Sequence, residues 1–198
     1  MDIQLPAPRY DGPVSLERSL SRRRSVREFS EGGLSLAEVS QLLWAAQGVT
    51  AGWGGRTAPS GGACYPLHVY TVGGMIEGLT CGVYRYEPKG HLLAIVKEGD
   101  QRRPLADAAL GQGFIASAPL DVVFSAVFQR ITVRYGERGK RYALMEAGHA
   151  AQNVLLQVVA MGLGAVPVGA FDDERVGRVL GFGPGEKAVY LLAIGRPR

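Results

Sequence analysis

Cysteine and histidine are scarce in this chain, which has two cysteines, Cys64 and Cys81, and three histidines. Two distant cysteines lack the density of a secreted disulfide framework and the spacing of a zinc site, so we expect reduced thiols and no metal. Long apolar runs are also missing, since no stretch reaches the ~18 residues of a membrane span. The first residues, MDIQLPAPRYDGP, lack a charged leader with an apolar core. These absences predict a soluble, cytoplasmic protein with no membrane partner.

The chain also lacks the charge pattern of a nucleic-acid-binding protein. Its net charge is +4 and its pI is near 9.2. The positive surplus is concentrated in residues 22–27 and 130–141, without a stripe of interleaved aromatic residues. We therefore predict local anion binding and no nucleic-acid partner.

Length and periodicity predict one domain over residues 1–198 with an α+β layout. The 46% hydrophobic content supports a real core, and the 28 glycines fall in clusters without a repeat. Ser35 and Glu38 form a capping box before an amphipathic helix, and Tyr142–Met161 is the longest helical segment. Further helices are expected at 16–23, 103–110 and 172–180, and strands at 67–72, 83–86, 92–97, 120–128, 166–169 and 188–194.

The first candidate site is the basic run from Arg23 to Arg27, with Ser25 at its centre. Guanidinium groups bind phosphate oxygens through paired N–H donors, and a serine hydroxyl adds a further contact, so the run suits a phosphate monoester. Each charge-assisted hydrogen bond contributes about 1.5–3 kcal/mol. Taken alone, a solvated basic turn or a nonspecific polyanion patch is the simpler interpretation.

The second candidate site, Pro59-Ser60-Gly61-Gly62, ends a glycine-rich loop directly before a predicted strand. Small residues let backbone amides approach a flat ligand, and Ser60 offers a hydroxyl. The sequence contains neither a Walker motif nor a GxGxxG fingerprint. Taken alone, a structural turn is again the simpler interpretation.

The third candidate site combines Glu146–Asn153 on the long helix with the small-residue segment Gly162–Asp172. His149 has no serine, cysteine or carboxylate partner at an informative spacing. We therefore interpret His149 as a packing or surface residue.

Together and in this order, the three segments resemble the FMN-dependent nitroreductase superfamily over nearly the whole chain. The resemblance is strongest to the subgroup that contains the peptide azoline dehydrogenases, which form thiazoles and oxazoles. It is carried by Arg23–Phe29, Pro59–Pro66, Glu146–Asn153, Gly162–Gly164 and Gly195–Pro197.

The resemblance implies a central, mainly antiparallel sheet flanked by helices, and a homodimer that holds FMN at its interface. Arg23, Arg24 and Ser25 would hold the FMN phosphate and ribityl chain, and Arg27 would face the pyrimidine edge of the ring. Gly169-Ala170 stands where several bacterial nitroreductases have Glu-Gly, so we assign no acid there.

The remaining cofactor contacts come from the glycine loop and the end of the chain. Ser60 and Gly61 would line the flavin from the other subunit, Pro167–Ala170 would lie along the ring, and Arg196 would join the phosphate site. The predicted cofactor-binding set is Arg23, Arg24, Ser25, Arg27, Pro59, Ser60, Gly61, Gly62, Pro167, Val168, Gly169, Ala170 and Arg196.

The implied activity is ping-pong hydride transfer from NAD(P)H through FMN to a nitroaromatic, a quinone or a similar small acceptor. A second hypothesis is an FMN-dependent dehydrogenase of azoline-type substrates, reoxidised by oxygen. Lys140 and Tyr142 are weak candidates for its base, because a solvated helix start explains them more simply. A third hypothesis is a non-catalytic flavin-binding module, and a fourth is nucleic-acid binding by the basic run.

Overall fold

The centre of the fold is strand β5, Leu120–Val127, which the continuous apolar run predicted. In the computed structural model, which describes residues 2–198, β5 is buried at every position except the last. It pairs antiparallel with β2, Leu67–Gly73, on one side and with β7, Glu186–Gly195, on the other. Because helices cover both faces of the sheet, both sets of alternating β5 side chains lie in the core.

The sheet has seven antiparallel strands in the order β1-β4-β3-β2-β5-β7-β6. Strands β3, Gly82–Glu87, and β4, Leu92–Glu98, form the predicted hairpin. The outer strands are β1, Asp2–Gln4, and β6, Gly164–Val168. The predicted α+β class with a mainly antiparallel sheet is confirmed.

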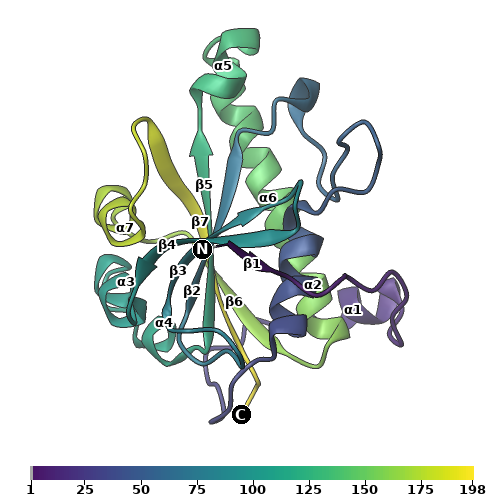
Figure 1. Ribbon diagram of the computed structural model, residues 1–198, viewed down its shortest axis with the longest axis vertical. Coiled ribbons are helices and arrows are strands. Elements are labelled where there is room, and N and C mark those ends of the chain that lie inside the picture. The colour runs from purple at the N-terminus through teal and green to yellow at the C-terminus, as the bar shows by residue number, and fades with distance from the viewer. Residues whose placement is uncertain (1) are drawn as a thin grey trace.

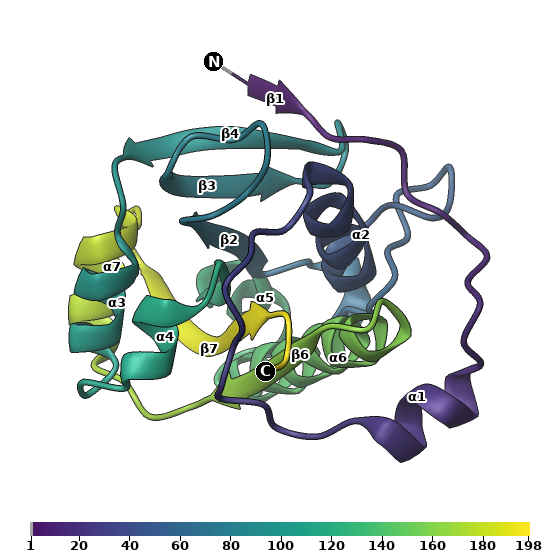
Figure 2. The ribbon, with the colours of Figure 1, turned by 90° about the horizontal axis from the view of Figure 1, so that it is seen from below.

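Helices form one layer on each face of the sheet (Figures 1 and 2). Helices α2 and α6 pack on one face, α3, α4 and α7 on the other, and α1 packs against α6. The buried face of α6 includes four alanines, Ala143, Ala147, Ala150 and Ala151, which allow the helix to pack closely on the sheet. The helix bounds are α1 Leu16–Arg22, α2 Leu36–Gln47, α3 Arg102–Ala108, α4 Gly113–Ser117, α6 Arg138–Ala160 and α7 Asp173–Leu180.

Local signals located most of these elements. The predicted capping box is present: the Ser35 amide donates to Glu38 Oε2 (2.8 Å) and the Glu38 amide donates to Ser35 Oγ (3.2 Å). Sequence analysis missed four short elements, and it placed the start of α6 four residues late. The missed elements are β1, α4, the 3₁₀ turn η1 at Gly61–Ala63, and α5 at Gln129–Tyr135.

Within residues 2–198, no helix is long and apolar enough to cross a membrane.

Candidate functional site

The first part of the site is a segment that we call the strap, residues 23–30, which lies along β6 and the end of β7. The Val26 amide donates to the Ala165 carbonyl (2.9 Å), and the Ser30 amide donates to the Arg196 carbonyl (2.9 Å). These contacts bring three predicted site segments, from distant parts of the chain, into one region: the basic run, the β6 segment and Arg196.

Two glycines let the strap lie directly against the sheet. A Cβ atom at Gly164 would lie 2.9 Å from Val26 Cβ, and one at Gly195 would lie 2.8 Å from Phe29 Cδ1. Real Cβ atoms do not approach other atoms so closely, so a side chain at either position would displace the strap.

The strap carries guanidinium groups without acidic partners. Within residues 2–198, Arg23, Arg24 and Arg27 form no ion pair. Arg24 donates to the carbonyls of Ser21 (3.1 Å) and Arg23 (2.8 Å). The Arg27 guanidinium lies 5.9 Å from the centre of the Phe114 ring.

Arg196 differs from these three arginines. Its Nη2 lies 3.1 Å from both carboxylate oxygens of Glu38, at the start of α2. Arg196 is thus close to the strap, but its side chain already has an acidic partner.

The second part of the site is the glycine turn around η1. The Tyr65 amide donates to Ser60 Oγ (2.8 Å), and Arg134 donates to the Gly62 carbonyl (3.2 Å). Gly62 has φ 59°, and a Cβ there would lie 2.6 Å from the Tyr135 hydroxyl. Both the backbone conformation and the close approach therefore require glycine at this position.

These two parts lie at opposite ends of α6 in one chain (Figure 1). A Cβ at Gly61 would lie 3.7 Å from Tyr142, near the start of α6, whereas the strap pairs with Ala165, just beyond its end. α6 has 23 residues, and at ~1.5 Å per residue it is roughly 33 Å long. A single chain therefore does not bring Ser60 and Gly61 to the strap.

Lys140 and Tyr142 lie at the end of α6 that carries the glycine turn. Lys140 is exposed and pairs with Glu137 (2.6 Å). Tyr142 is half-buried, and its ring centre lies 5.3 Å from that of Tyr135. Tyr142 is thus the one of the two that contacts the turn, whereas His149 is exposed farther along α6.

Glu146 is a buried carboxyl group that sequence analysis did not single out. It is 2% exposed, and neither of its oxygens has an aligned hydrogen bond within the described residues. Burial raises its pKa to about 7, although Ser60, Arg56 and Gln47 act to lower it. The sequence did contain a signal for this burial. Glu146 lies three residues after Ala143 and four before Ala150, so all three residues share one face of the helix.

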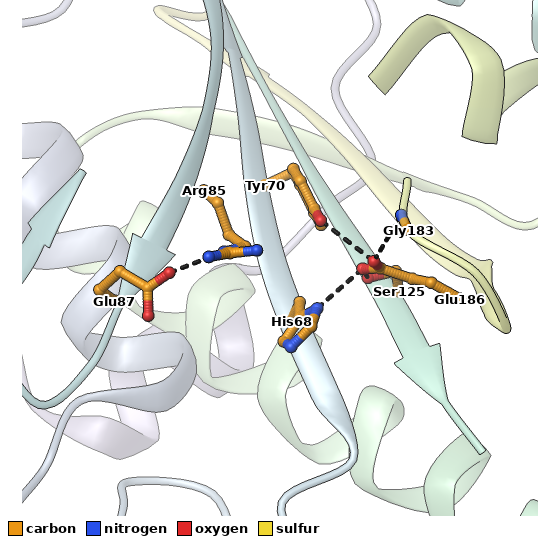
Figure 3. A network of polar contacts seen from close by, with 7 residues as sticks. All are labelled: His68, Tyr70, Arg85, Glu87, Ser125, Gly183 and Glu186. Atoms are coloured by element: carbon orange, nitrogen blue, oxygen red, sulfur yellow. Dashed lines mark hydrogen bonds and ion pairs between the residues drawn. The ribbon is translucent and has the colours of Figure 1, made fainter. Parts of the chain in front are cut away.

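A cluster of polar side chains, which the sequence did not indicate, surrounds Glu186 (Figure 3). His68 Nδ1 lies 2.9 Å from Glu186 Oε1, the Tyr70 hydroxyl donates to Oε2 (3.2 Å), and the Ser125 hydroxyl also donates to the carboxylate. Burial opposes ionisation of Glu186, but these hydrogen bonds outweigh it and lower its pKa.

Comparison with known proteins assigns the class. Residues 20–196 match the model of a protein family described as "Nitroreductase family". A Methanocaldococcus jannaschii protein named for the nitroreductases is 43% identical over 196 residues, covering 99% of this chain and 96% of its own. The Escherichia coli microcin B17-processing protein McbC is 27% identical, covering 84% of this chain and 65% of its own.

Solved structures show the same fold. A nitroreductase structure from Ralstonia eutropha is similar with a TM-score of 0.87 and 34% identity, covering 100% of this chain and 90% of its own. The Vibrio harveyi NADPH:FMN oxidoreductase, solved with NAD⁺, has a TM-score of 0.67 and 19% identity, covering 92% of this chain and 68% of its own.

The chain belongs to the nitroreductase family, as the sequence motifs indicated. Its relatives include a microcin B17-processing protein and a protein of the trifolitoxin operon. Membership of this family supports an oxidoreductase.

Proposed function

We propose that this protein is an FMN-dependent oxidoreductase that acts as a homodimer, with one flavin bound between the strap of one subunit and the glycine turn of the other. The observation that carries the proposal is the convergence of three features in one region: guanidinium groups that form no ion pair within residues 2–198, the glycine-lined start of β6, and the exposed Gly169. A two-fold dimer then supplies the turn that one chain keeps far from its own strap.

The residues of the strap fit the phosphate of FMN. Arg23 and Arg27 have no acidic partner within residues 2–198, so no ion pair must break before they bind an anion. Arg23, Arg24 and Ser25 would hold the phosphate and the ribityl chain. Arg196 would have to share its guanidinium between Glu38 and the phosphate.

The β6 segment fits the planar ring. A Cβ at Gly169 would meet no atom within 4 Å, so the surface is open there, and Ala170 is also exposed. Bound FMN supplies the hydride chemistry. The chain would orient the ring along Pro167–Ala170, offer a backbone N–H as a donor, and place the Arg27 charge at the pyrimidine edge.

NAD(P)H is the proposed reductant, and a nitroaromatic, a quinone or a similar small acceptor is the proposed oxidant. The name of the Vibrio harveyi neighbour, an NADPH:FMN oxidoreductase, supports the choice of reductant. No side-chain acid stands at Gly169-Ala170, so we expect an acceptor whose reduction does not need one.

A dehydrogenase of azoline-type substrates is the second candidate. The relationship to McbC and the contact of Tyr142 with the glycine turn favour it. In a dimer, Tyr142 would accompany Ser60 and Gly61 to the partner's flavin, where its hydroxyl could act on a substrate proton.

The visible absorption spectrum of the purified protein tests flavin binding. We expect the two bands of oxidised flavin, and Arg23→Gln should weaken FMN binding by roughly 10-fold or more, because one charge-assisted contact of about 1.5–3 kcal/mol is lost. Arg103→Gln is the matched control, since Arg103 is an exposed arginine on α3 that pairs with Asp107. A colourless protein that binds no added FMN would refute the proposal.

Anaerobic mixing with NADPH separates the two candidate reactions. Rapid loss of flavin colour supports the reductase. Colour that persists with NADPH, but is lost with an azoline peptide, supports the dehydrogenase.

A further inference from the structure

A second polar site lies at the end of the sheet far from the strap. A cavity of about 240 Å³ opens where β2 begins and β3 ends. Glu186 and Gly195 are the two ends of β7, so about nine residues at ~3.3 Å each separate this end of the sheet from the strap. We call this cavity the basic pocket; its polar lining is Gln47, Arg56, His68, Arg85, Glu87 and Arg130.

The basic pocket has more positive than negative charge. Three guanidinium groups line it against one carboxylate, Glu87, which pairs with Arg85 (2.7 Å). Within residues 2–198, neither Arg56 nor Arg130 forms an ion pair. Burial lowers the pKa of Arg56 even though the Glu146 carboxyl acts in the opposite direction, so its charge is incompletely balanced.

His68 is held in one orientation with one nitrogen free. Glu186 is ionised at neutral pH because its pKa is lowered, so it can only accept, and the proton must be on His68 Nδ1. Nε2 is the ring nitrogen that remains for a ligand in the pocket, because Nδ1 is taken by Glu186. The side chain of His68 is 19% exposed and lines the basic pocket, close to Arg85 (Figure 3).

Gln47 adds a buried donor at the wall of the pocket. It is 0% exposed, its Oε1 accepts from Arg56 (3.0 Å), and its Nε2 has no hydrogen-bond partner within the described residues. Gln47 also acts to lower the pKa of the neighbouring Glu146 carboxyl, so its amide lies between Arg56 and Glu146 and holds the Arg56 guanidinium at the pocket wall.

We propose that the basic pocket binds a phosphate group. Arg85, Arg56 and Arg130 supply donors to its oxygens, and His68 lines the same cavity. The volume suits free phosphate or the terminal phosphate of a small metabolite, and the proposal does not depend on the flavin site.

Calorimetric titration of inorganic phosphate into the purified protein, with any bound flavin retained, tests the site at pH 7. We expect saturable binding that Arg130→Gln weakens about 10-fold. Arg130 is exposed and makes no hydrogen bond or ion pair within residues 2–198, so this variant should fold normally. Arg103→Gln again controls for the loss of one positive charge.

Two further measurements separate this site from the flavin site and identify the source of the phosphate. Phosphate binding that persists in Arg23→Gln supports the assignment, whether or not the protein binds FMN. Methyl phosphate binding as tightly as phosphate indicates the head group of a larger ligand, and weaker binding indicates the free ion. Equal affinity in Arg130→Gln and the unmodified protein, or loss of binding in Arg23→Gln alone, would overturn the proposal.

Discussion

Glu146 makes the stability of the protein depend on pH. Its pKa is about 7 when folded, against an ordinary value of 4.5. Between these values the folded state binds more protons than the unfolded state, so the free energy of unfolding falls as pH rises from about 4.5 to about 7. Below this window the contribution disappears, and above it the penalty is complete.

We therefore expect Glu146→Gln to stabilise the protein at pH 8, by up to about 3 kcal/mol, and to leave its stability nearly unchanged at pH 4. The amide has almost the same shape as the carboxyl group but does not ionise. Urea unfolding of both proteins across this pH range measures the effect. Parallel pH profiles for the two proteins would contradict the assignment of this slope to Glu146.

The contact between the strap and β6 depends on the absence of a side chain at one position. Because a Cβ at Gly164 would lie 2.9 Å from Val26 Cβ, Gly164→Ala should push the strap away from the sheet. We expect a loss of about 1–3 kcal/mol of stability, and weaker FMN binding because the arginines move with the strap.

Shortening the opposing side chain should reverse this effect. In the background Val26→Gly, which removes the clashing Cβ and both γ carbons, the Gly164→Ala substitution should cost much less, and thermal unfolding with flavin titration measures this coupling. Gly113→Ala is the control for adding a methyl group, since a Cβ there meets no atom within 4 Å. Additive effects of the two substitutions would show that the strap does not rest on Gly164.

At the scale of the whole molecule, α6 leaves two large apolar side chains exposed, Leu144 at 53% and Met145 at 47%. The exposed Gly148 and Gln152 continue the same face of the helix. Exposed apolar patches of this kind mark interfaces. Pairing of two α6 helices across a two-fold axis would bring the turn of one subunit towards the strap of the other.

We expect Met145→Glu to yield monomers in light scattering and to lose FMN at the same time. Val96→Glu is the matched control, because Val96 is 38% exposed on β4, near the other edge of the sheet. A Met145→Glu monomer that keeps full flavin affinity would exclude a site shared between subunits.

Local signals were sufficient for most of the fold. The period of α6, the capping box at Ser35 and the apolar run of β5 are all encoded by neighbours in the chain, so these elements were located, although α6 begins four residues before the predicted start. β1 has three residues, too few for a period to be recognised, and α5 has no side-chain N-cap to mark where it begins.

The sequence by itself determined the class of the protein, because the order of the basic run, the glycine loop and the helix motif is a property of the chain. It also indicated which residues could bind the phosphate and the planar ring of a flavin. The tertiary structure alone decided that the strap lies on β6 and that the glycine turn lies at the far end of α6. It also brought His68 to Glu186, 118 positions away, where strand pairing builds a basic pocket that no local pattern records.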